Sequence, residues 1–478
     1  MGIINDGKAD IVVGTTGGYV IAYHADGTFL WARKTGNLEV ATKPAIADID
    51  GDGKPEIVVG AGEAAKNGGG VYVLRNNGTL KCSFTALDTT PLGGGVFSSP
   101  AIGRLDATRP NEMQIVVGSW DAHVRALHAD CSLWWVKGIP DDVIDTVWSS
   151  PALYDLDSDG QIDVIIGVDS GQGTLPGGIK VGGQLRAFRG DGIGELPGFP
   201  IKLDEVIFSS PAIGDISGTR HPAIVVGNGR CYDMPGCAPG GLSHPVTEAL
   251  FGWNATGSAL AGWPYAMPSQ STRTSSPALV DLDGDGKLET VMTTLVKSSN
   301  PAVADFEGYV HVVRSDGTAY PGWPIQPTMP KTCSTNAPWG TTFASPIAVD
   351  IDGDGKPEIL SPVGTQVSIW NRNGTQLSYT YVDACIGNPN PAIYQLRANS
   401  GIFSTPTAAD LDGDGKIDVV VGSASTLGGP IGALFAWRFP NSVAKPASLP
   451  WPQFRHDERN TGVYVSDGIF RNGFEATP

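Results

Sequence analysis

A unit of related sequence recurs eight times along the 478-residue chain and constrains its fold more than any other feature. Most units combine Ser-Ser-Pro-Ala or a variant, a loop that is usually acidic, a β-branched segment, an alternating segment and a tight turn. The first loop position falls at residues 2, 48, 104, 155, 215, 281, 350 and 410. Four short antiparallel strands at this period are typical of propeller blades. We predict an all-β, eight-bladed β-propeller of four-stranded antiparallel blades, with seven blades as the alternative.

Five of the eight loops carry the pattern Asp-x-Asp-x-Asp-Gly-x-x-Asp/Glu. One such loop could be a solvated acidic turn, but its recurrence favours a metal site. Carboxylates at positions 1, 3, 5 and 9, with the backbone carbonyl at position 7, suit a hard cation of the size of Ca²⁺. The closing acid at position 9, without flanking helices, distinguishes the loop from an EF-hand. We expect about five structural Ca²⁺ ions. The predicted ligands are Asp48, Asp50, Asp52, Lys54, Glu56, Asp155, Asp157, Asp159, Gln161, Asp163, Asp281, Asp283, Asp285, Lys287, Glu289, Asp350, Asp352, Asp354, Lys356, Glu358, Asp410, Asp412, Asp414, Lys416 and Asp418.

The remaining loops and the two ends of the chain complete the predicted organisation. Arg104 and Ala223 occupy ligand positions in repeats 3 and 5, so we expect ordinary hydrogen bonds to hold those loops. Residues 5–10 read as the second half of another acidic loop, which indicates a start inside a longer protein or a missing half supplied from elsewhere. Residues 461–466 are expected to complete blade 1 beside the N-terminal strands. The prediction is one domain over residues 1–466 and a tail over 467–478.

Charge and cysteine content indicate the compartment and the class of partner. The formal net charge is −17, and the five loops hold twenty of the 49 acidic residues, so nucleic acid is an improbable partner. We find no apolar stretch that could span a membrane. The six cysteines favour an oxidising compartment, and hence a secreted or cell-surface protein, with six unrelated reduced thiols as the alternative. Cys231 and Cys237 could close a short disulfide loop. Cys82 and Cys131 follow the same turn in consecutive repeats, and Cys333 and Cys385 lie in two corresponding long loops, but the sequence leaves the disulfide pairing open.

With these motifs in view, the chain resembles the FG-GAP family, also called VCBS repeats, found in integrin α-subunit propellers and in many bacterial secreted proteins. The resemblance covers nearly the whole chain. It implies calcium between strands 1 and 2 of a blade and ligand binding, where it occurs, on the opposite face. The Phe-Gly and Gly-Ala-Pro signatures are weak here, and integrin propellers have seven blades. Residues 26–31 and 451–455 show a weaker similarity to quinoprotein-type propellers.

The long loops on the face opposite the acidic loops are where we expect recognition. Tyr232, Trp339, Tyr394 and Arg397 are the candidate ligand-binding residues, with packing against their own loops as the alternative. Residues Phe97, Trp148, Phe208, Phe343 and Phe403 precede the Ser-Pro unit at one offset, which predicts core packing near the axis.

No catalytic constellation stands out in the sequence. The chain lacks Gly-x-Ser-x-Gly, His-Glu-x-x-His and the full Gly-x-x-x-x-Gly-Lys-Ser/Thr phosphate loop. His456-Asp457-Glu458 is interpreted as a solvated connector and not as an acid–base pair. The sequence favours a non-catalytic binding or adhesion module for an extracellular carbohydrate or protein. The alternatives are a propeller enzyme, lyase-like or quinoprotein-like, and a scaffold that presents another domain.

Overall fold

The computed structural model describes residues 3, 7–36, 38–62, 68–85, 94–138, 146–169, 182–229, 248–267, 271–297, 306–327, 344–378, 394–423 and 432–464. The described chain is almost entirely strands and turns, with a single 3-10 turn, η1 (Pro446–Ser448). No helix in this part of the chain is long and apolar enough to cross a membrane.

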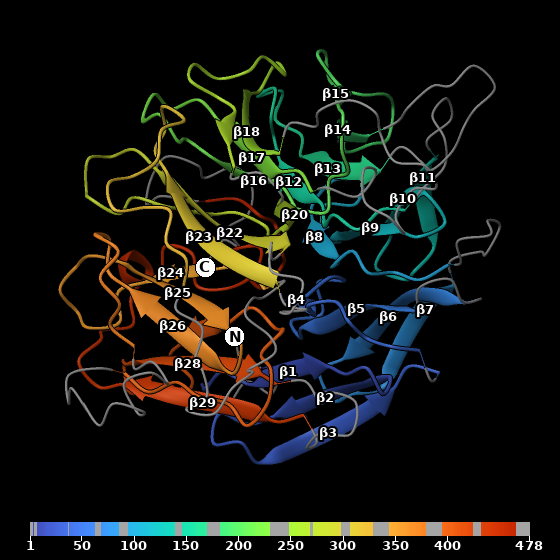
Figure 1. Ribbon diagram of the computed structural model, residues 1–478. Coiled ribbons are helices and arrows are strands. Elements are labelled where there is room, and N and C mark those ends of the chain that lie inside the picture. The colour runs from blue at the N-terminus through green and yellow to red at the C-terminus, as the bar shows by residue number, and fades with distance from the viewer. Residues whose placement is uncertain are drawn as a thin grey trace.

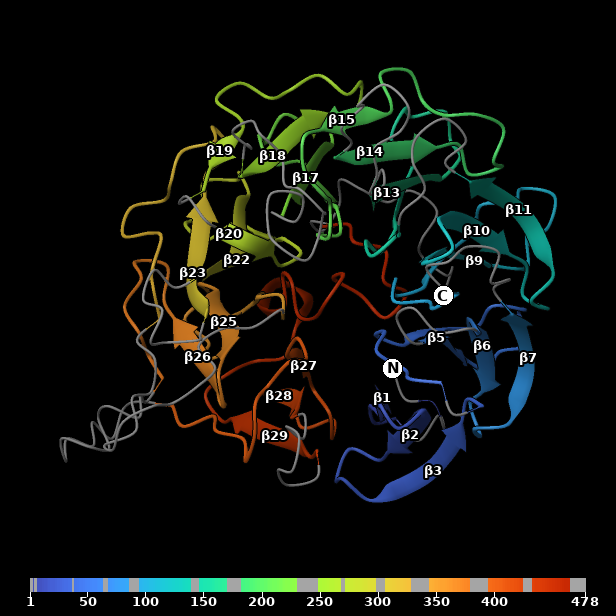
Figure 2. The same cartoon turned by 45° about the vertical axis from the view of Figure 1, so that its right-hand side comes forward.

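Eight antiparallel sheets follow one another in chain order around a common centre (Figure 1, Figure 2), and we number them 1 to 8. Sheets 1 to 4 consist of β1 (Ile11–Gly14), β2 (Tyr19–Tyr23) and β3 (Phe29–Lys34); β4 (Ala45–Ala47), β5 (Glu56–Gly62), β6 (Gly69–Arg75) and β7 (Leu80–Thr85); β8 (Ala101–Gly103), β9 (Gln114–Ser119), β10 (His123–Leu127) and β11 (Leu133–Gly138); and β12 (Ala152–Tyr154), β13 (Asp163–Asp169), β14 (Gly183–Phe188) and β15 (Ile201–Leu203). Sheets 5 to 8 consist of β16 (Ala212–Gly214), β17 (Ala223–Gly227), β18 (Ala249–Asn254) and β19 (Tyr265–Ala266); β20 (Ser271–Thr274), β21 (Ala278–Val280), β22 (Glu289–Lys297) and β23 (Phe306–Val313); β24 (Ile347–Val349), β25 (Glu358–Val363) and β26 (Gln366–Trp370); and β27 (Thr407–Ala409), β28 (Ile417–Gly422) and β29 (Leu434–Phe439).

The apolar pattern of each strand follows its distance from the centre. Ile57, Val58 and Val59 of β5 are all fully buried, because both faces of this strand pack against neighbouring sheets. The outer strand β7 contains only exposed and half-buried residues. Continuous apolar runs on inner strands and partly exposed outer strands are therefore the expected consequence of packing sheets face to face in a ring.

The two serines of the Ser-Ser-Pro motif accept two different hydrogen bonds. The first serine accepts a hydrogen bond from its own sheet, as between the Gly118 N–H and Ser98 Oγ at 3.1 Å. The second serine accepts one from the preceding sheet, as between the Ser150 N–H and Ser210 Oγ at 2.9 Å. The same sheet-to-sheet bond runs from Lys43 to Ser99, Ser99 to Ser150, Ser210 to Ser276, Ser276 to Ser345 and Ser345 to Thr405, at 2.9–3.0 Å. A chain of hydrogen bonds thus links sheets 2 to 8.

The C-terminal segment does not take the position that we expected. Residues 461–464 do not lie beside β1 to β3, because Val463 forms a parallel bridge with Ile213 of sheet 5. The segment supplies carbonyls to the innermost strands of successive sheets: Glu458 O to the Ile46 N–H (2.8 Å), Arg459 O to Ile102 (2.9 Å), Thr461 O to Leu153 (3.0 Å) and Gly462 O to Ile213 (2.9 Å). Buried strand edges need such acceptors. This need, and not a missing strand of sheet 1, fixes the path of the segment.

Basic side chains hold this segment at the centre by hydrogen bonds. The Lys43 ammonium donates to the carbonyls of Phe454 (2.9 Å) and Asp457 (2.7 Å). Arg455 is 1 % exposed and donates to the Pro151 carbonyl at 2.8 Å and to that of Pro211. The expected solvated connector at residues 456–458 holds only for Glu458, which is exposed. His456 and Asp457 are half-buried, and the Asp457 carboxylate accepts from the Thr461 N–H at 3.1 Å.

Sheets 1 and 8 meet at a seam. The Ala9 N–H donates to the Leu411 carbonyl at 3.0 Å, which joins the two sheets by a backbone hydrogen bond. A cavity of about 300 Å³ lies beside this bond and is lined by Ala25, Leu411, Asp418, Ala436 and Arg438. Charged side chains therefore line this seam.

Candidate metal centres

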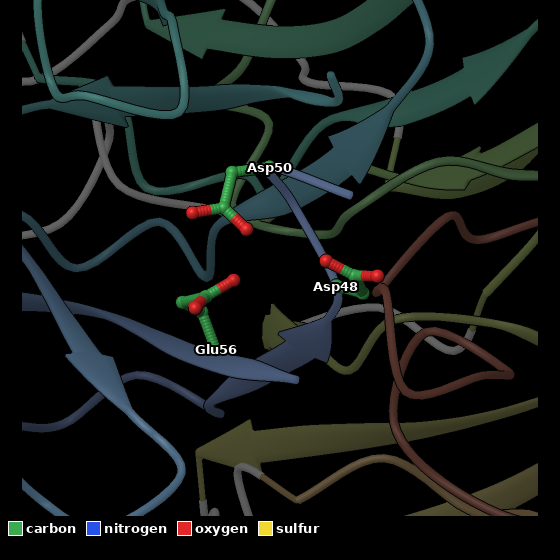
Figure 3. Close-up of side chains that lie close together, drawn as sticks. All are labelled: Asp48, Asp50 and Glu56. Carbon is green, nitrogen blue, oxygen red and sulfur yellow. The ribbon is translucent and has the colours of Figure 1, made fainter. Parts of the chain in front are cut away.

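The five predicted loops each bring at least three carboxylates together. In every loop, one oxygen from each of three acids lies within 4.8 Å of the other two. Figure 3 shows this convergence for Asp48, Asp50 and Glu56. The other groups are Asp155, Asp157 and Asp163; Asp281, Asp283 and Asp285; Asp350, Asp352 and Glu358; and Asp410, Asp412 and Asp418.

Backbone hydrogen bonds shape each loop from its first acid. The Asp48 carboxylate accepts from the Gly51 N–H through Oδ1 (2.8 Å) and from the Gly53 N–H through Oδ2 (2.8 Å). Gly51 and Gly53 have φ of 75° and 83°, a left-handed conformation that glycine adopts without the Cβ clash. These contacts explain the glycines at positions 4 and 6 and orient the acid at position 1.

Strand register sets the closing acid at position 9. Glu358 is the first residue of β25 and is paired with Val349, the last residue of β24. Its Oε2 accepts from the Ile351 N–H at 3.0 Å. The same bond joins Glu56 to Ile49, Asp163 to Leu156, Glu289 to Leu282 and Asp418 to Leu411. The hairpin between the first two strands therefore returns the closing acid to the start of the loop.

Burial and mutual repulsion disfavour the charged form of the closing acids. Burial, followed by the neighbouring carboxylates, raises the pKa of Asp163 to about 7, that of Glu289 to about 7 and that of Glu358 to about 8. A divalent cation among these oxygens would reverse the effect. The all-oxygen donor set fits a hard cation such as Ca²⁺.

Repeats 3 and 5 hold their loops without the acidic pattern, as expected. Gln114 takes the place of the closing acid, and its Oε1 accepts from the N–H groups of Leu105 and Asp106, both at 2.9 Å. In repeat 5 the Asp215 carboxylate accepts from the Thr219 N–H at 3.0 Å. Hydrogen bonds to a side-chain amide or a single carboxylate thus give a similar turn where the metal pattern is lost.

Sequence reasoning missed the basic side chains that contact some of these loops. Lys81 pairs with Asp50 and Glu56, Arg189 with Asp157 and Asp159, and Arg438 with Asp412, Asp414 and Asp418. The contact of Arg438 with Asp418 could have been predicted by pairing the two strands as a hairpin, because Arg438 lies opposite Asp418 in the register of β28 and β29.

The predicted ligand-binding residues are only partly within the described chain. Tyr232 and Trp339 lie outside it. The Tyr394 ring is half-buried, 5.1 Å from the Phe439 ring, and Arg397 forms a bridge with Gln366. The structure does not bring these two residues to one formed pocket among the described residues, and their role in binding stays a prediction.

The repeated aromatic residues form a cluster in sheets 3 to 5. The Trp148 ring lies 5.4 Å from that of Phe97 and 5.6 Å from that of Phe208, and Trp120 joins at 5.0 Å. The rings pack against one another, but they are half-buried and belong to none of the buried core clusters, so the expected core packing is not confirmed. Phe403 differs, with 38 % of its surface exposed, and Phe343 lies outside the described residues.

The structure contains a disulfide, as the cysteine content indicated, and it decides which residues pair. Cys82 of β7 is bonded to Cys131, which precedes β11, so the bond links the outer parts of sheets 2 and 3. Cys231, Cys237, Cys333 and Cys385 lie outside the described residues.

Comparisons with known proteins agree with this architecture. Similar solved structures include the Vibrio cholerae biofilm matrix protein Bap1 (TM-score 0.55, 14 % identity, covering 94 % of this chain and 87 % of that one). A europium-containing methanol dehydrogenase gives 0.52 and 12 % (97 % and 87 % covered), and BamB from Moraxella catarrhalis 0.50 and 12 % (91 % and 92 %). At these identities the similarity shows the fold alone, and that fold is a β-propeller. Residues 3–59 match the FG-GAP-like repeat, so the chain carries a repeat of this family. No curated protein matches the chain in sequence.

Proposed function

We propose that the chain is an eight-bladed, calcium-stabilised β-propeller of the extracellular space that binds a carbohydrate or protein ligand without catalysis. The observation that carries the proposal is the recurrence of three convergent carboxylates, with oxygens within 4.8 Å, in five equivalent loops. Bound Ca²⁺ would neutralise each loop and so add to folding stability. The carboxylates and the carbonyls of Lys54, Gln161, Lys287, Lys356 and Lys416 are the proposed ligands.

The location and the partner class rest on charge and covalent chemistry. The Cys82–Cys131 disulfide favours an oxidising compartment. The net charge of −17 favours ligands other than nucleic acid. A protein of similar fold is a biofilm matrix protein, which is consistent with a role of this fold outside the cell.

The centre of the molecule favours a binding module over a quinoprotein-like enzyme. Such an enzyme needs a cofactor-sized axial pocket lined by stacking aromatic rings. Here, Arg455 fills the space between the Pro151 and Pro211 carbonyls, and Asn460 donates to the Pro100 carbonyl at 2.8 Å. Recognition is instead proposed for the long loops between strands, with Tyr232, Trp339, Tyr394 and Arg397 as the candidate residues.

An array of glycans and matrix proteins, probed in calcium and again in chelator, tests this function. We expect calcium-dependent binding to at least one ligand. Asp283→Ala should lower the calcium content by one ion and reduce thermal stability, because Asp283 is one of three convergent acids. The control Glu112→Ala lies in the repeat-3 loop and should leave the metal content unchanged. Unchanged metal in Asp283→Ala contradicts the metal assignment, and a folded chain that binds nothing contradicts the binding assignment.

A further inference from the structure

The five acidic loops differ in whether the protein already places a positive charge among their carboxylates. Resting on the calcium binding proposed above, we propose that Lys81 and Arg438 serve as built-in cations for loops 48–56 and 410–418. These two loops would then bind Ca²⁺ weakly, whereas loops 281–289 and 350–358 would bind it tightly. The proposal concerns the order in which the sites fill and which parts of the ring depend on the ion.

Arg438 reaches most of the acids of its loop. Its Nε lies 3.2 Å from Asp418 Oδ1, its Nη1 lies 3.1 Å from Asp414 Oδ2, and its Nη2 contacts Asp412. The closing acid and two outer acids therefore share one guanidinium. A planar group with five N–H donors can satisfy several carboxylates at once.

Lys81 makes the corresponding contacts in sheet 2 from a different strand. It projects from β7, and its Nζ contacts Asp50 and lies 3.5 Å from Glu56 Oε1. The Lys81 side chain is only 13 % exposed, so its ammonium is held close to the loop. An ammonium between positions 3 and 9 lies among two of the three acids that would hold the ion.

Loops 281–289 and 350–358 lack such a partner within the described part of the chain. Within the described residues, the acids of these two loops form ion pairs only between Lys287 and Asp285 (3.9 Å) and between Lys356 and Asp354 (3.5 Å). Both lysine side chains are more than half exposed. Neither contact involves the closing acids Glu289 and Glu358. The guanidinium of Arg314, which follows β23, instead lies 5.3 Å from the centre of the Tyr320 ring.

Loop 155–163 is intermediate between these two groups. Arg189 contacts Asp157 at 3.2 Å and Asp159 at 2.8 Å, but these are the outer acids and not Asp163. We expect its affinity to lie between those of the two groups.

Under this proposal, the nearby basic side chains set the affinity of each loop for a cation. A cation that enters loop 410–418 must displace Arg438 or bind beside a like charge, and either lowers its affinity. In loops 281–289 and 350–358 only an ion relieves the repulsion, so binding there is stronger. The seam between sheets 1 and 8 lies next to loop 410–418, where Ala9 bonds to Leu411. Arg438 would keep this junction closed when calcium is scarce, while sheets 6 and 7 would loosen first.

Calcium titration of the full chain, followed by calorimetry and by terbium luminescence, tests the proposal. The unmodified chain should show at least two classes of site. Arg438→Met and Lys81→Met keep the apolar stem and should each raise the affinity of one weak site by about tenfold or more. The matched controls Arg33→Met and Lys34→Met remove the same charges from exposed positions of β3, outside the five loops, and should change affinity by less than about threefold.

A second pair of variants keeps the test decisive if Arg438→Met or Lys81→Met fails to fold. Asp352→Ala should abolish a tight step of the titration, whereas Asp412→Ala should abolish a weak one. Five equivalent sites, or equal changes in Arg438→Met and Arg33→Met, would overturn the two-class proposal but leave calcium binding intact. Absence of any ion uptake would overturn both proposals.

Discussion

At the scale of single residues, the closing acid of each loop is both a proposed metal ligand and a group with a raised pKa. Glu358 is buried at the start of β25, and its carboxylate accepts a backbone N–H from Ile351 at 3.0 Å. Burial and its acidic neighbours nevertheless raise its pKa to about 8. Backbone hydrogen bonding alone does not compensate for burial and repulsion, and the proposed Ca²⁺ would supply the compensating charge.

This pKa predicts how stability depends on pH in the absence of metal. The folded pKa of Glu358, about 8, lies above the ordinary value of 4.5, so between these values the folded chain binds more protons than the unfolded chain. Stability in chelator should therefore fall as pH rises from about 5 to about 8. Thermal melts should show this slope, a smaller slope in Glu358→Gln, and little of it in calcium. A melting temperature that rises over this range in chelator would contradict the assignment.

At the scale of structural elements, the sheets are joined through hydroxyl groups at their inner ends. The second serine of each motif accepts a backbone N–H from the preceding sheet, and both partners are buried, as for Ser150 and Ser210. The proline that follows has no N–H of its own to satisfy. The motif therefore recurs because every sheet needs the same contact with its neighbour.

Ser210→Ala tests this contact. The substitution would leave the buried Ser150 N–H without an acceptor, which costs about 1–3 kcal/mol. Chemical denaturation of the calcium-loaded chain should show a loss of this size. Ser217→Ala, at an exposed position of the same repeat, should change stability by less than about 0.5 kcal/mol. Equal effects of the two substitutions would argue against the serine chain as a stabilising element.

At the scale of the whole molecule, residues 451–464 hold several sheets at once. Their carbonyls accept from the innermost strands of sheets 2, 3, 4, 5, 7 and 8. Removing them would leave buried N–H groups unsatisfied at six strand edges and would leave the Lys43 ammonium without its two acceptors.

Truncation tests this role. A chain that ends at Pro450 should not fold stably, because the lost hydrogen bonds are spread around the ring and no other described segment supplies them. Circular dichroism and a melt of the soluble fraction would measure the loss. A chain that ends at residue 466 should melt like the parent if residues 467–478 are a tail. Parent-like melting of the shorter chain would contradict the role of the segment.

The sequence by itself determined the features that are local and repeated. The acidic loops, the strand pattern and the propeller class follow from spacings of a few residues that recur along the chain. The sequence placed Cys82 and Cys131 after the same turn of adjacent repeats but left their pairing open. Short-range periodicity is visible in sequence because it reflects the geometry of one strand or turn.

Only the tertiary structure decided which distant groups meet. Arg455 binds the carbonyls of Pro151 and Pro211 from 304 and 244 residues away, and Lys81 reaches Asp50 from another strand. The C-terminal path differs from the predicted one for the same reason. A segment that resembled a missing strand instead follows the unsatisfied inner edges of many sheets, and those edges exist only once the ring is assembled.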